Sequence, residues 1–142
     1  MRNLLPTDRA ARCASGATSL GVQQLAYFLA ISQEDVHRAL KLTEQAMELI
    51  GPCPEFLDTR GVALHATGRF DEAVAEFRRA VGNNPTGLRL YHLARACHAA
   101  GDTESAMEAW KEAHDQQELT LDQVPFYEQH QYRVTAELLQ KN

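Results

Sequence analysis

Long apolar runs are missing from this 142-residue sequence. No stretch approaches the ~20 apolar residues that a membrane-spanning helix requires, so we expect no membrane partner. In the opening "MRNLLPTDRAARCASGATSL", Pro6, Thr7 and Asp8 interrupt the apolar stretch that a secretory signal needs. Residues 1–17 have no periodicity, which predicts a flexible leader. Their Arg-rich, acid-poor composition is also that of an organellar transit segment.

Cysteine is scarce, and its spacing does not suit the common cysteine-based structures. The sequence has three cysteines, Cys13, Cys53 and Cys97, which form no CxxC and leave one thiol over. This spacing indicates neither a disulfide framework nor a zinc ribbon. We therefore expect a reducing compartment and place the protein in the cytoplasm.

Basic residues are outnumbered, with 14 Lys and Arg against 19 Asp and Glu and a net charge of −5. Residues 1–17 carry +2, so the remaining residues carry −7. Nucleic acids and anionic membrane surfaces attract concentrated Lys and Arg. An acidic body of this kind argues against both as partners.

Catalytic and metal-binding motifs are also missing. There is no HExxH, GxSxG, P-loop or GxGxxG. Cys97 and His98 are adjacent, and adjacent helical residues point about 100° apart, so they do not form a nucleophile–base pair. His65 and His98 are 33 residues apart, which is the repeat spacing described below. With Asp58 they could bind a metal ion, so a metal-binding regulator is a minor alternative. We expect no enzyme activity, no cofactor and no metal site.

A repeated pattern is the most informative feature that is present. Adding 33 to the positions of the segment 71–81 reproduces four of its five apolar or small residues, and Gly68 maps onto Gly101. The matching pairs are Ala73/Ala106, Val74/Met107, Phe77/Trp110 and Ala80/Ala113, with Val81/His114 as the exception. A step of 34 backwards finds Ala39 and Ala46, but Thr43 in place of the aromatic residue. A period near 34 predicts stacked helix pairs.

The residue types suit such a stack. Small residues such as Gly61 let two helix backbones approach closely, and a large aromatic residue such as Phe77 fills the space between neighbouring pairs. Gly68 and Gly101 supply the left-handed residue that ends the first helix of a pair. Pro85 stops the second helix.

These residues resemble the tetratricopeptide repeat family, whose pattern has "A-x3-F-x2-A" in the second helix, a Gly at the helix turn and a closing Pro. "GRFDEAVAEFRRAVGNNP" is similar to it throughout, and "GDTESAMEAWKEAHDQQ" lacks only the Pro. The resemblance implies an all-α fold, a tetratricopeptide-type α-solenoid of antiparallel helix pairs. It places repeats at about 20–53, 54–86 and 87–119 in a single domain, residues 18–142, with a capping helix at about 122–140.

The family is an interaction module whose first helices line a concave groove that commonly holds a peptide. The resemblance therefore implies non-catalytic binding of a protein or peptide on this face. The candidate partner-binding residues are Phe28, Asp58, Val62, His65, Tyr91, Arg95 and His98. One subclass of the family clamps a C-terminal carboxylate with Lys, Asn and Arg. The corresponding residues here are Gln24, Asp58, Thr59, Tyr91 and His92, so we expect no such clamp.

The first helix, "LGVQQLAYFLAI", is apolar around nearly its whole circumference. A terminal repeat normally turns a polar face outward. Three explanations are open for this apolar helix. The leader covers the helix, or the chain is the C-terminal end-module of a longer array. Alternatively, the helix self-associates to form a homo-oligomer through Val22, Leu25 and Phe28. At the other end, Val124, Tyr127, Gln131, Val134 and Leu138 predict one mostly apolar stripe on the capping helix.

Overall fold

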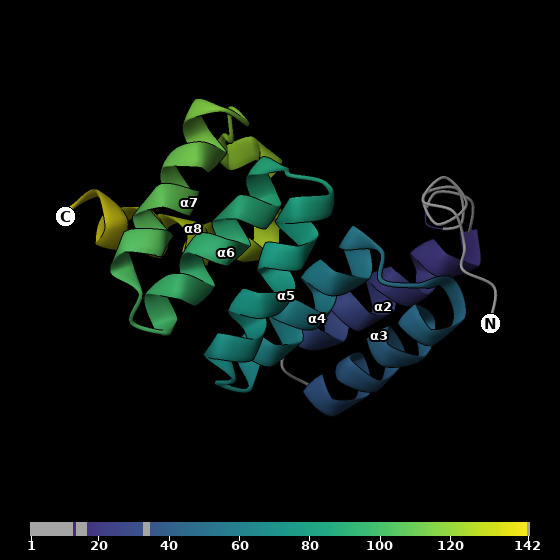
Figure 1. The fold of residues 1–142 in the computed structure, drawn as a ribbon. Helices are drawn as coiled ribbons and strands as arrows, with labels where there is room; N and C mark the ends of the chain where they lie inside the picture. Colours follow the sequence, from purple (N-terminus) through teal and green to yellow (C-terminus); the bar gives the residue numbers. More distant parts are fainter. Residues whose placement is uncertain (1–12, 14–16, 33–34, 142) are drawn as a thin grey trace.

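The computed structural model of the protein describes residues 13, 17–32 and 35–141. Within these residues every regular element is a helix, and consecutive helices pack as pairs (Figure 1). The elements are α2 (Ala17–Ser32), α3 (Val36–Ile50), α4 (Pro54–Ala66), α5 (Phe70–Asn83), α6 (Gly87–Ala99), α7 (Thr103–Asp115), the 3-10 turns η1 (Leu121–Gln123) and η2 (Phe126–Glu128), and α8 (Gln129–Gln140). The prediction of an all-α solenoid of helix pairs is confirmed. The predicted leader lies outside the described residues, apart from Cys13 and Ala17.

Glycines end the first helices of the second and third pairs, as predicted. Gly68 and Gly101 have φ values of 79° and 87°, in the left-handed region that glycine adopts at no steric cost. After Gly68, the N–H of Arg69 donates to the carbonyl of Leu64 at 3.0 Å. The same bond recurs one repeat later, and it satisfies a carbonyl that the end of the helix would otherwise leave open.

Side-chain caps fix where three of the helices begin. Asp35, Thr86 and Asp102 each accept a hydrogen bond from the backbone N–H three residues later. Such caps satisfy amides that have no partner within the helix. They set the starts of α3, α6 and α7.

The core lies between the two layers of helices. Ala73, Ala80, Ala106 and Ala113 are fully buried, and Phe77 and Trp110 are buried beside them. The small residues let the helices approach, as the repeat pattern predicts. The first helices α2, α4 and α6 follow one another side by side, with α4 in contact with both of its neighbours.

Gly61 shows why a residue without a side chain is needed in α4. A Cβ at this position would lie 2.5 Å from Cε1 and 2.8 Å from Cζ of Phe77. The ring of Phe77 therefore packs directly on the backbone of α4. This contact joins the two helices of the second pair.

The structure corrects the interpretation of the cysteines. Cys13 and Cys53 form a disulfide with a Cα–Cα distance of 5.7 Å, while Cys97 is free and buried. The two half-cystines are 40 residues apart, and only the fold brings them together. Cys53 lies directly before α4, next to the buried Phe56 and Ala46. The spacing alone therefore could not reveal the pairing.

The C-terminal helix also differs from the prediction. α8 begins at Gln129, after two 3-10 turns, and not near residue 122. The face that α8 buries carries Thr135 and Leu139, with Tyr132 packed beside them. Of the predicted stripe, Val124 is buried, whereas Tyr127, Val134 and Leu138 are exposed.

None of the helices in the described part of the chain is both long enough and apolar enough to cross a membrane.

Candidate functional site: the concave groove

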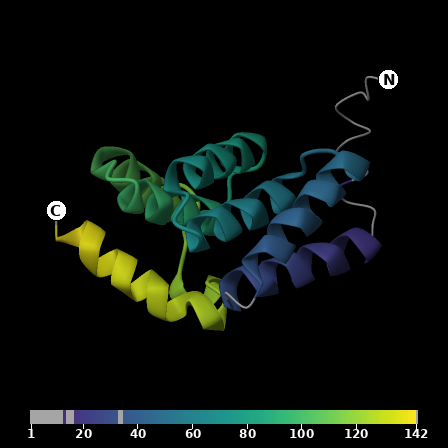
Figure 2. The ribbon, with the colours of Figure 1, turned by 90° about the horizontal axis from the view of Figure 1, so that it is seen from below.

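The C-terminal segment returns across the face formed by the first helices. Figure 2 shows α8, in yellow, along one side of the helix rows, with its first residues next to α2. Further along, Tyr132 packs on Tyr91 and Trp110 with ring centroids 5.4 and 5.2 Å away. We call the face lined by α2, α4 and α6 the concave groove, and we call residues 125–128 the groove segment.

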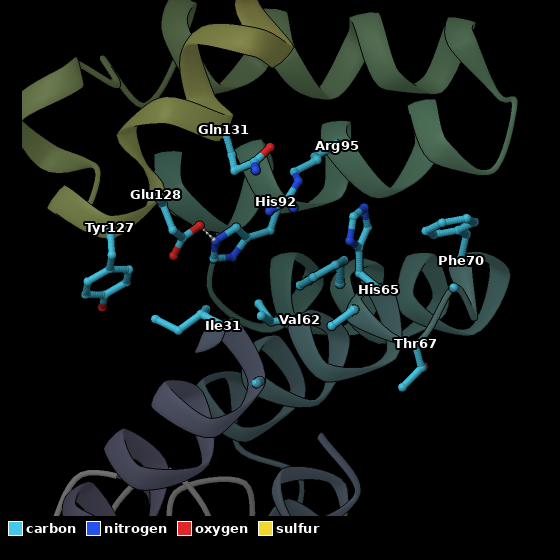
Figure 3. Close-up of a pocket in the computed structure, with 14 residues that line it drawn as sticks. Ile31, Val62, His65, Thr67, Phe70, His92, Arg95, Tyr127, Glu128 and Gln131 are labelled. Atoms are coloured by element: carbon cyan, nitrogen blue, oxygen red, sulfur yellow. Dashed lines mark hydrogen bonds and ion pairs between the residues drawn. The ribbon is translucent and has the colours of Figure 1, made fainter. Parts of the chain in front are cut away.

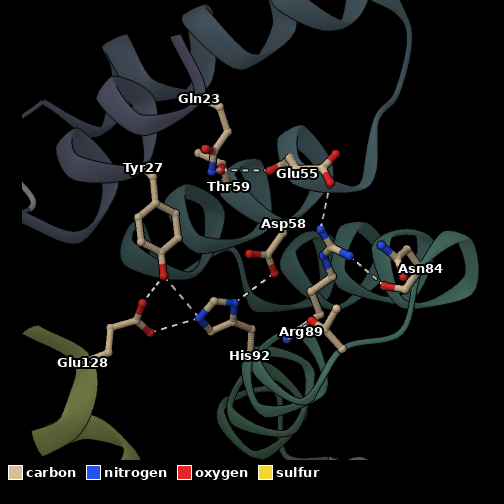
Figure 4. A network of polar contacts seen from close by, with 10 residues as sticks. Gln23, Tyr27, Glu55, Asp58, Thr59, Asn84, Arg89, His92 and Glu128 are labelled. Carbon is tan, nitrogen blue, oxygen red and sulfur yellow. Dashed lines mark hydrogen bonds and ion pairs between the residues drawn. The ribbon is translucent and has the colours of Figure 1, made fainter. Parts of the chain in front are cut away.

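One buried network connects the groove segment to all three first helices (Figure 4). His92 of α6 lies between two carboxylates, with Nδ1 2.8 Å from Asp58 Oδ1 and Nε2 2.9 Å from Glu128 Oε2. The hydroxyl of Tyr27 in α2 donates to the other oxygen of Glu128. Asp58 is on α4, so each first helix contributes one residue. The His92 side chain is only 1% exposed.

The network needs one shared proton. His92 Nδ1–H donates to the Asp58 carboxylate, so one more proton is required between His92 Nε2 and the Glu128 carboxyl group. Burial raises the pKa of Glu128 from 4.5 to about 7, because the interior disfavours the charged form. Loss of this proton would leave the Nε2 lone pair of His92 facing the Glu128 carboxylate. The contact between His92 and Glu128 therefore weakens as pH rises.

A pH dependence of stability follows from Glu128. The folded protein holds a proton on this group between its unfolded pKa of 4.5 and about 7, and the unfolded chain does not. The contribution of Glu128 to stability therefore falls as pH rises from 4.5 to 7 and is flat above 7. At 1.36 kcal/mol per pH unit the fall amounts to about 3 kcal/mol.

The measurement is urea unfolding of the wild type and the Glu128→Gln variant across this pH range. Gln keeps the size of the side chain, accepts from Tyr27 and donates to His92, but it does not titrate. As pH rises from 4.5 to 7, the free energy of unfolding of the wild type should fall by about 3 kcal/mol relative to that of the variant. A difference independent of pH would contradict this account of Glu128.

Two pockets open on either side of the groove segment. The first has a volume of about 540 Å³ and lies between α4, α6 and the start of α8 (Figure 3). The second, of about 510 Å³, is lined by α2, α4, the start of α6 and the groove segment. Ile31 and Tyr127 line both pockets. The groove segment therefore contributes to the walls of both pockets.

The first pocket combines a cation with a neutral imidazole. Arg95 lines it and forms no ion pair within the described part of the chain. His65 also lines it, and Nε2 of this side chain is buried without a hydrogen bond. Burial, and then the charge of Arg95, lower the pKa of His65 to about 4, so the ring is neutral near pH 7. Arg95 therefore supplies positive charge to this pocket, whereas His65 does not.

The second pocket is more apolar and its charges are paired. Phe28, Ile31 and Leu88 form apolar parts of its wall. Glu55 accepts from Arg89 at 3.2 Å, and Arg89 also donates to the carbonyl of Asn84. This pocket suits an apolar side chain better than an ion.

The predicted partner-binding residues lie in several different environments. Phe28 and Asp58 line the second pocket, and Val62, His65 and Arg95 line the first. Tyr91 is fully buried under Tyr132, so it is not accessible in this arrangement. His98 lines neither pocket.

The self-association candidates are only partly exposed. Leu25 and Phe28 are 43% and 55% exposed, and Leu20 is exposed as well. Val22 is half-buried and packs beside Ala46 and Phe56. The outer surface of α2 is therefore apolar at Leu20, Leu25 and Phe28, whereas Val22 belongs to the interior.

The metal alternative is not supported in the part of the chain that the structure describes. No group of three or more His, Cys, Asp or Glu side chains there is placed to hold a metal ion. Asp58, the proposed third ligand beside His65 and His98, is bonded to His92 instead.

Sequence reasoning missed Tyr27 and Glu128, and it assigned no pairing to His92. One signal was available, because Asp58 and His92 are 34 residues apart, one repeat period. Glu55 and Arg89 have the same separation. Equivalent positions on neighbouring first helices lie side by side, so acid–base pairs at this spacing are expected to meet. Nothing comparable indicates Glu128, which lies outside the repeats.

Comparison with known families agrees with the helix pairs. The tetratricopeptide repeat family model matches residues 54–79 and 88–112, which cover most of α4–α5 and of α6–α7. A search of curated protein sequences finds no significant match. Tetratricopeptide repeats are generally non-catalytic scaffolds that bind proteins or peptides. Two helix pairs of the chain, α4–α5 and α6–α7, thus match the tetratricopeptide repeat, and a further helix pair precedes them and a C-terminal helix follows.

Proposed function

We propose that the protein binds a segment of another protein in the concave groove, with contacts in the two pockets beside the groove segment. The observation that supports this most directly is the pair of pockets of about 540 and 510 Å³. Each is large enough to hold several side chains of a peptide. Both are built from the first helices of the repeats.

The two pockets favour different parts of such a segment. Phe28 in the second pocket offers an exposed ring for an apolar side chain. Arg95 in the first pocket offers a cation without an acidic partner among the described residues, which favours an acidic group. Buried aromatic and Arg contacts carry much of the energy of typical interfaces. A partner segment with an apolar residue and an acidic residue fits both pockets.

The experiment selects peptides from a random display library on the full chain and then measures their affinity for variants. Phe28→Asp and Arg95→Glu should each weaken binding at least ~10-fold, a loss of about 1.4 kcal/mol. Leu49→Asp and Arg38→Glu make the same changes at exposed positions of α3, outside both pockets, and should leave the affinity unchanged. Selected peptides that respond equally to both sets of variants would contradict groove binding.

Self-association through α2, or a role as the end-module of a longer array, is a second candidate. It rests on the exposed apolar side chains of Leu20, Leu25 and Phe28. An apolar surface of this kind is typical of an association site. Light scattering after gel filtration should then show a dimer or aggregate that Leu25→Glu disperses. A monomer at all concentrations would exclude self-association.

A further inference from the structure

We propose that the groove segment is an intramolecular ligand, and that the partner displaces it with a segment of the same chemistry: an aromatic ring followed by a carboxylate. This inference rests on the proposed function, because it identifies what the concave groove recognises. It also identifies a segment of the chain itself that competes with the partner for the concave groove.

The groove segment is weakly built into the rest of the molecule. Phe126 and Tyr127 are 88% and 57% exposed, so they contribute little to the core. Its own backbone bond is local, from Glu128 N–H to the Pro125 carbonyl at 2.8 Å. Apart from the Glu128 side chain, which bonds to Tyr27 and His92, the segment has few buried apolar contacts, and segments of this kind open at low cost.

The helix that follows is anchored elsewhere. Tyr132 stacks near Tyr91 and Trp110, and its hydroxyl donates to His114 Nε2 at 2.7 Å. The donor direction follows because His114 Nδ1 must donate to the Trp110 carbonyl at 2.7 Å. Release of the groove segment therefore does not require α8 to leave α6 and α7.

The contacts of the groove segment are those expected of a bound peptide. The ring of Tyr127 lies 6.2 Å from that of Tyr27, at 58°, and the Glu128 carboxyl group bonds to Tyr27 and His92. Figure 4 shows Glu128 and Asp58 at opposite sides of the His92 ring. One aromatic contact and one carboxylate contact thus define the motif, in consecutive residues.

One receiving residue, His92, is held in place independently of the groove segment. His92 is fixed by Asp58 and by the neighbouring rings of Tyr91 and Phe77, at 5.3 and 5.6 Å. A carboxylate from another chain would therefore find its donors already oriented, which lowers the entropic cost of binding.

The charges around the site favour an acidic ligand of limited charge. Glu128 contacts Tyr27 from α2 and His92 from α6, and it lines the first pocket together with His65, Arg95 and Gln131. Asp58 lies on the other side of the His92 ring (Figure 4). Asp58 is already bonded to His92, and Arg95, which lines the same pocket as Glu128, forms no ion pair among the described residues. One carboxylate is therefore accommodated. Higher pH would weaken the resident segment and a competing carboxylate alike.

Tethering gives the groove segment an advantage over any partner. A segment on the same chain acts at an effective concentration of up to the millimolar range. A free peptide of the same sequence should therefore bind the wild type poorly. It should bind well only when the resident segment is weakened.

The experiment measures binding of a fluorescent peptide, VPFYEQH, which copies residues 124–130, to the full chain by anisotropy. The Tyr127→Ala/Glu128→Ala chain should bind it at least ~10-fold more tightly than the wild type does. Peptides in which the Tyr becomes Ala, or the Glu becomes Gln, should lose most of this affinity. Adding Tyr27→Phe to the opened chain should weaken binding, because the phenol donor is lost.

Controls separate the possible outcomes. Val134→Ala/Glu137→Ala changes exposed residues of α8 and should leave the wild-type affinity unchanged. Trp110 fluorescence reports whether α8 stays docked in each variant. Equal peptide affinity for the wild type and the opened chain would overturn the inference, as would no binding to either. A dimer that requires Glu128 would assign the segment to a second copy of the chain and would also overturn it.

Failure here is distinguishable from failure of the proposed function. If display-selected peptides bind through Phe28 and Arg95 while VPFYEQH does not bind the opened chain, only this inference fails. If neither kind of peptide binds, both fail.

Discussion

Replacing Phe77 with Ala should lower the free energy of unfolding by about 3–5 kcal/mol, as for other fully buried aromatic residues. The side chain is buried between α4 and α5, with Gly61 against one part of the ring and His92 at 5.6 Å. Removal of the ring leaves a cavity where the second pair contacts the third. Urea unfolding followed by circular dichroism measures the loss.

A double-mutant cycle identifies the cause. Gly61→Ala alone should cost about 1–3 kcal/mol, because its new Cβ would lie 2.5 Å from the Phe77 ring. Combined with Phe77→Leu, which withdraws the ring atoms, the same Gly61→Ala change should cost much less. The two changes should therefore be strongly non-additive. Simple additivity would mean that the ring does not pack on the α4 backbone.

Replacing Asp58 with Ala should cost about 3 kcal/mol, since it leaves the buried Nδ1–H of His92 without an acceptor. The His92 side chain is 1% exposed, and Asp58 is the only partner of its Nδ1 within the described residues. Water does not replace the lost carboxylate easily at that depth. The measurement is again urea unfolding, performed near pH 6.

Glu55→Ala is the matched control. Like Asp58, Glu55 is an acidic residue of α4, and its partner Arg89 lies one repeat further along the chain. The Glu55 side chain is 46% exposed, and Arg89 keeps its bond to the Asn84 carbonyl. The cost should stay below about 1 kcal/mol, as for partly exposed pairs. Equal losses in the two variants would contradict the assignment of Asp58 as a buried support of His92.

Most of the repeat architecture was predictable from the sequence. Gly68 and Gly101 indicate where helices end, because glycine readily adopts the left-handed conformation. The buried alanines follow from helix periodicity. The repeat period itself predicts that Asp58 faces His92, because equivalent positions of neighbouring repeats are adjacent. These features depend on local residue chemistry and on the repeat period, both of which can be read from a sequence.

The remaining features depend on contacts between distant segments. Cys13 meets Cys53 only because the first helix pair folds between them. The position of Glu128 depends on the path of the chain after α7, where Pro125 and two 3-10 turns redirect it across the groove. Tyr91 was predicted to face a partner, but Tyr132 covers it. No periodic signal in residues 115–130 encodes that return.

The central claim is that the groove segment lies against α2 in solution. Proton NMR tests it most directly, through nuclear Overhauser contacts between the rings of Tyr27 and Tyr127, whose centroids are 6.2 Å apart. The contact between Trp110 and Tyr132 serves as the internal reference for a docked α8. We expect both contacts at pH 6 and a weaker Tyr27–Tyr127 contact at pH 8. A Trp110–Tyr132 contact with no Tyr27–Tyr127 contact at either pH would contradict it.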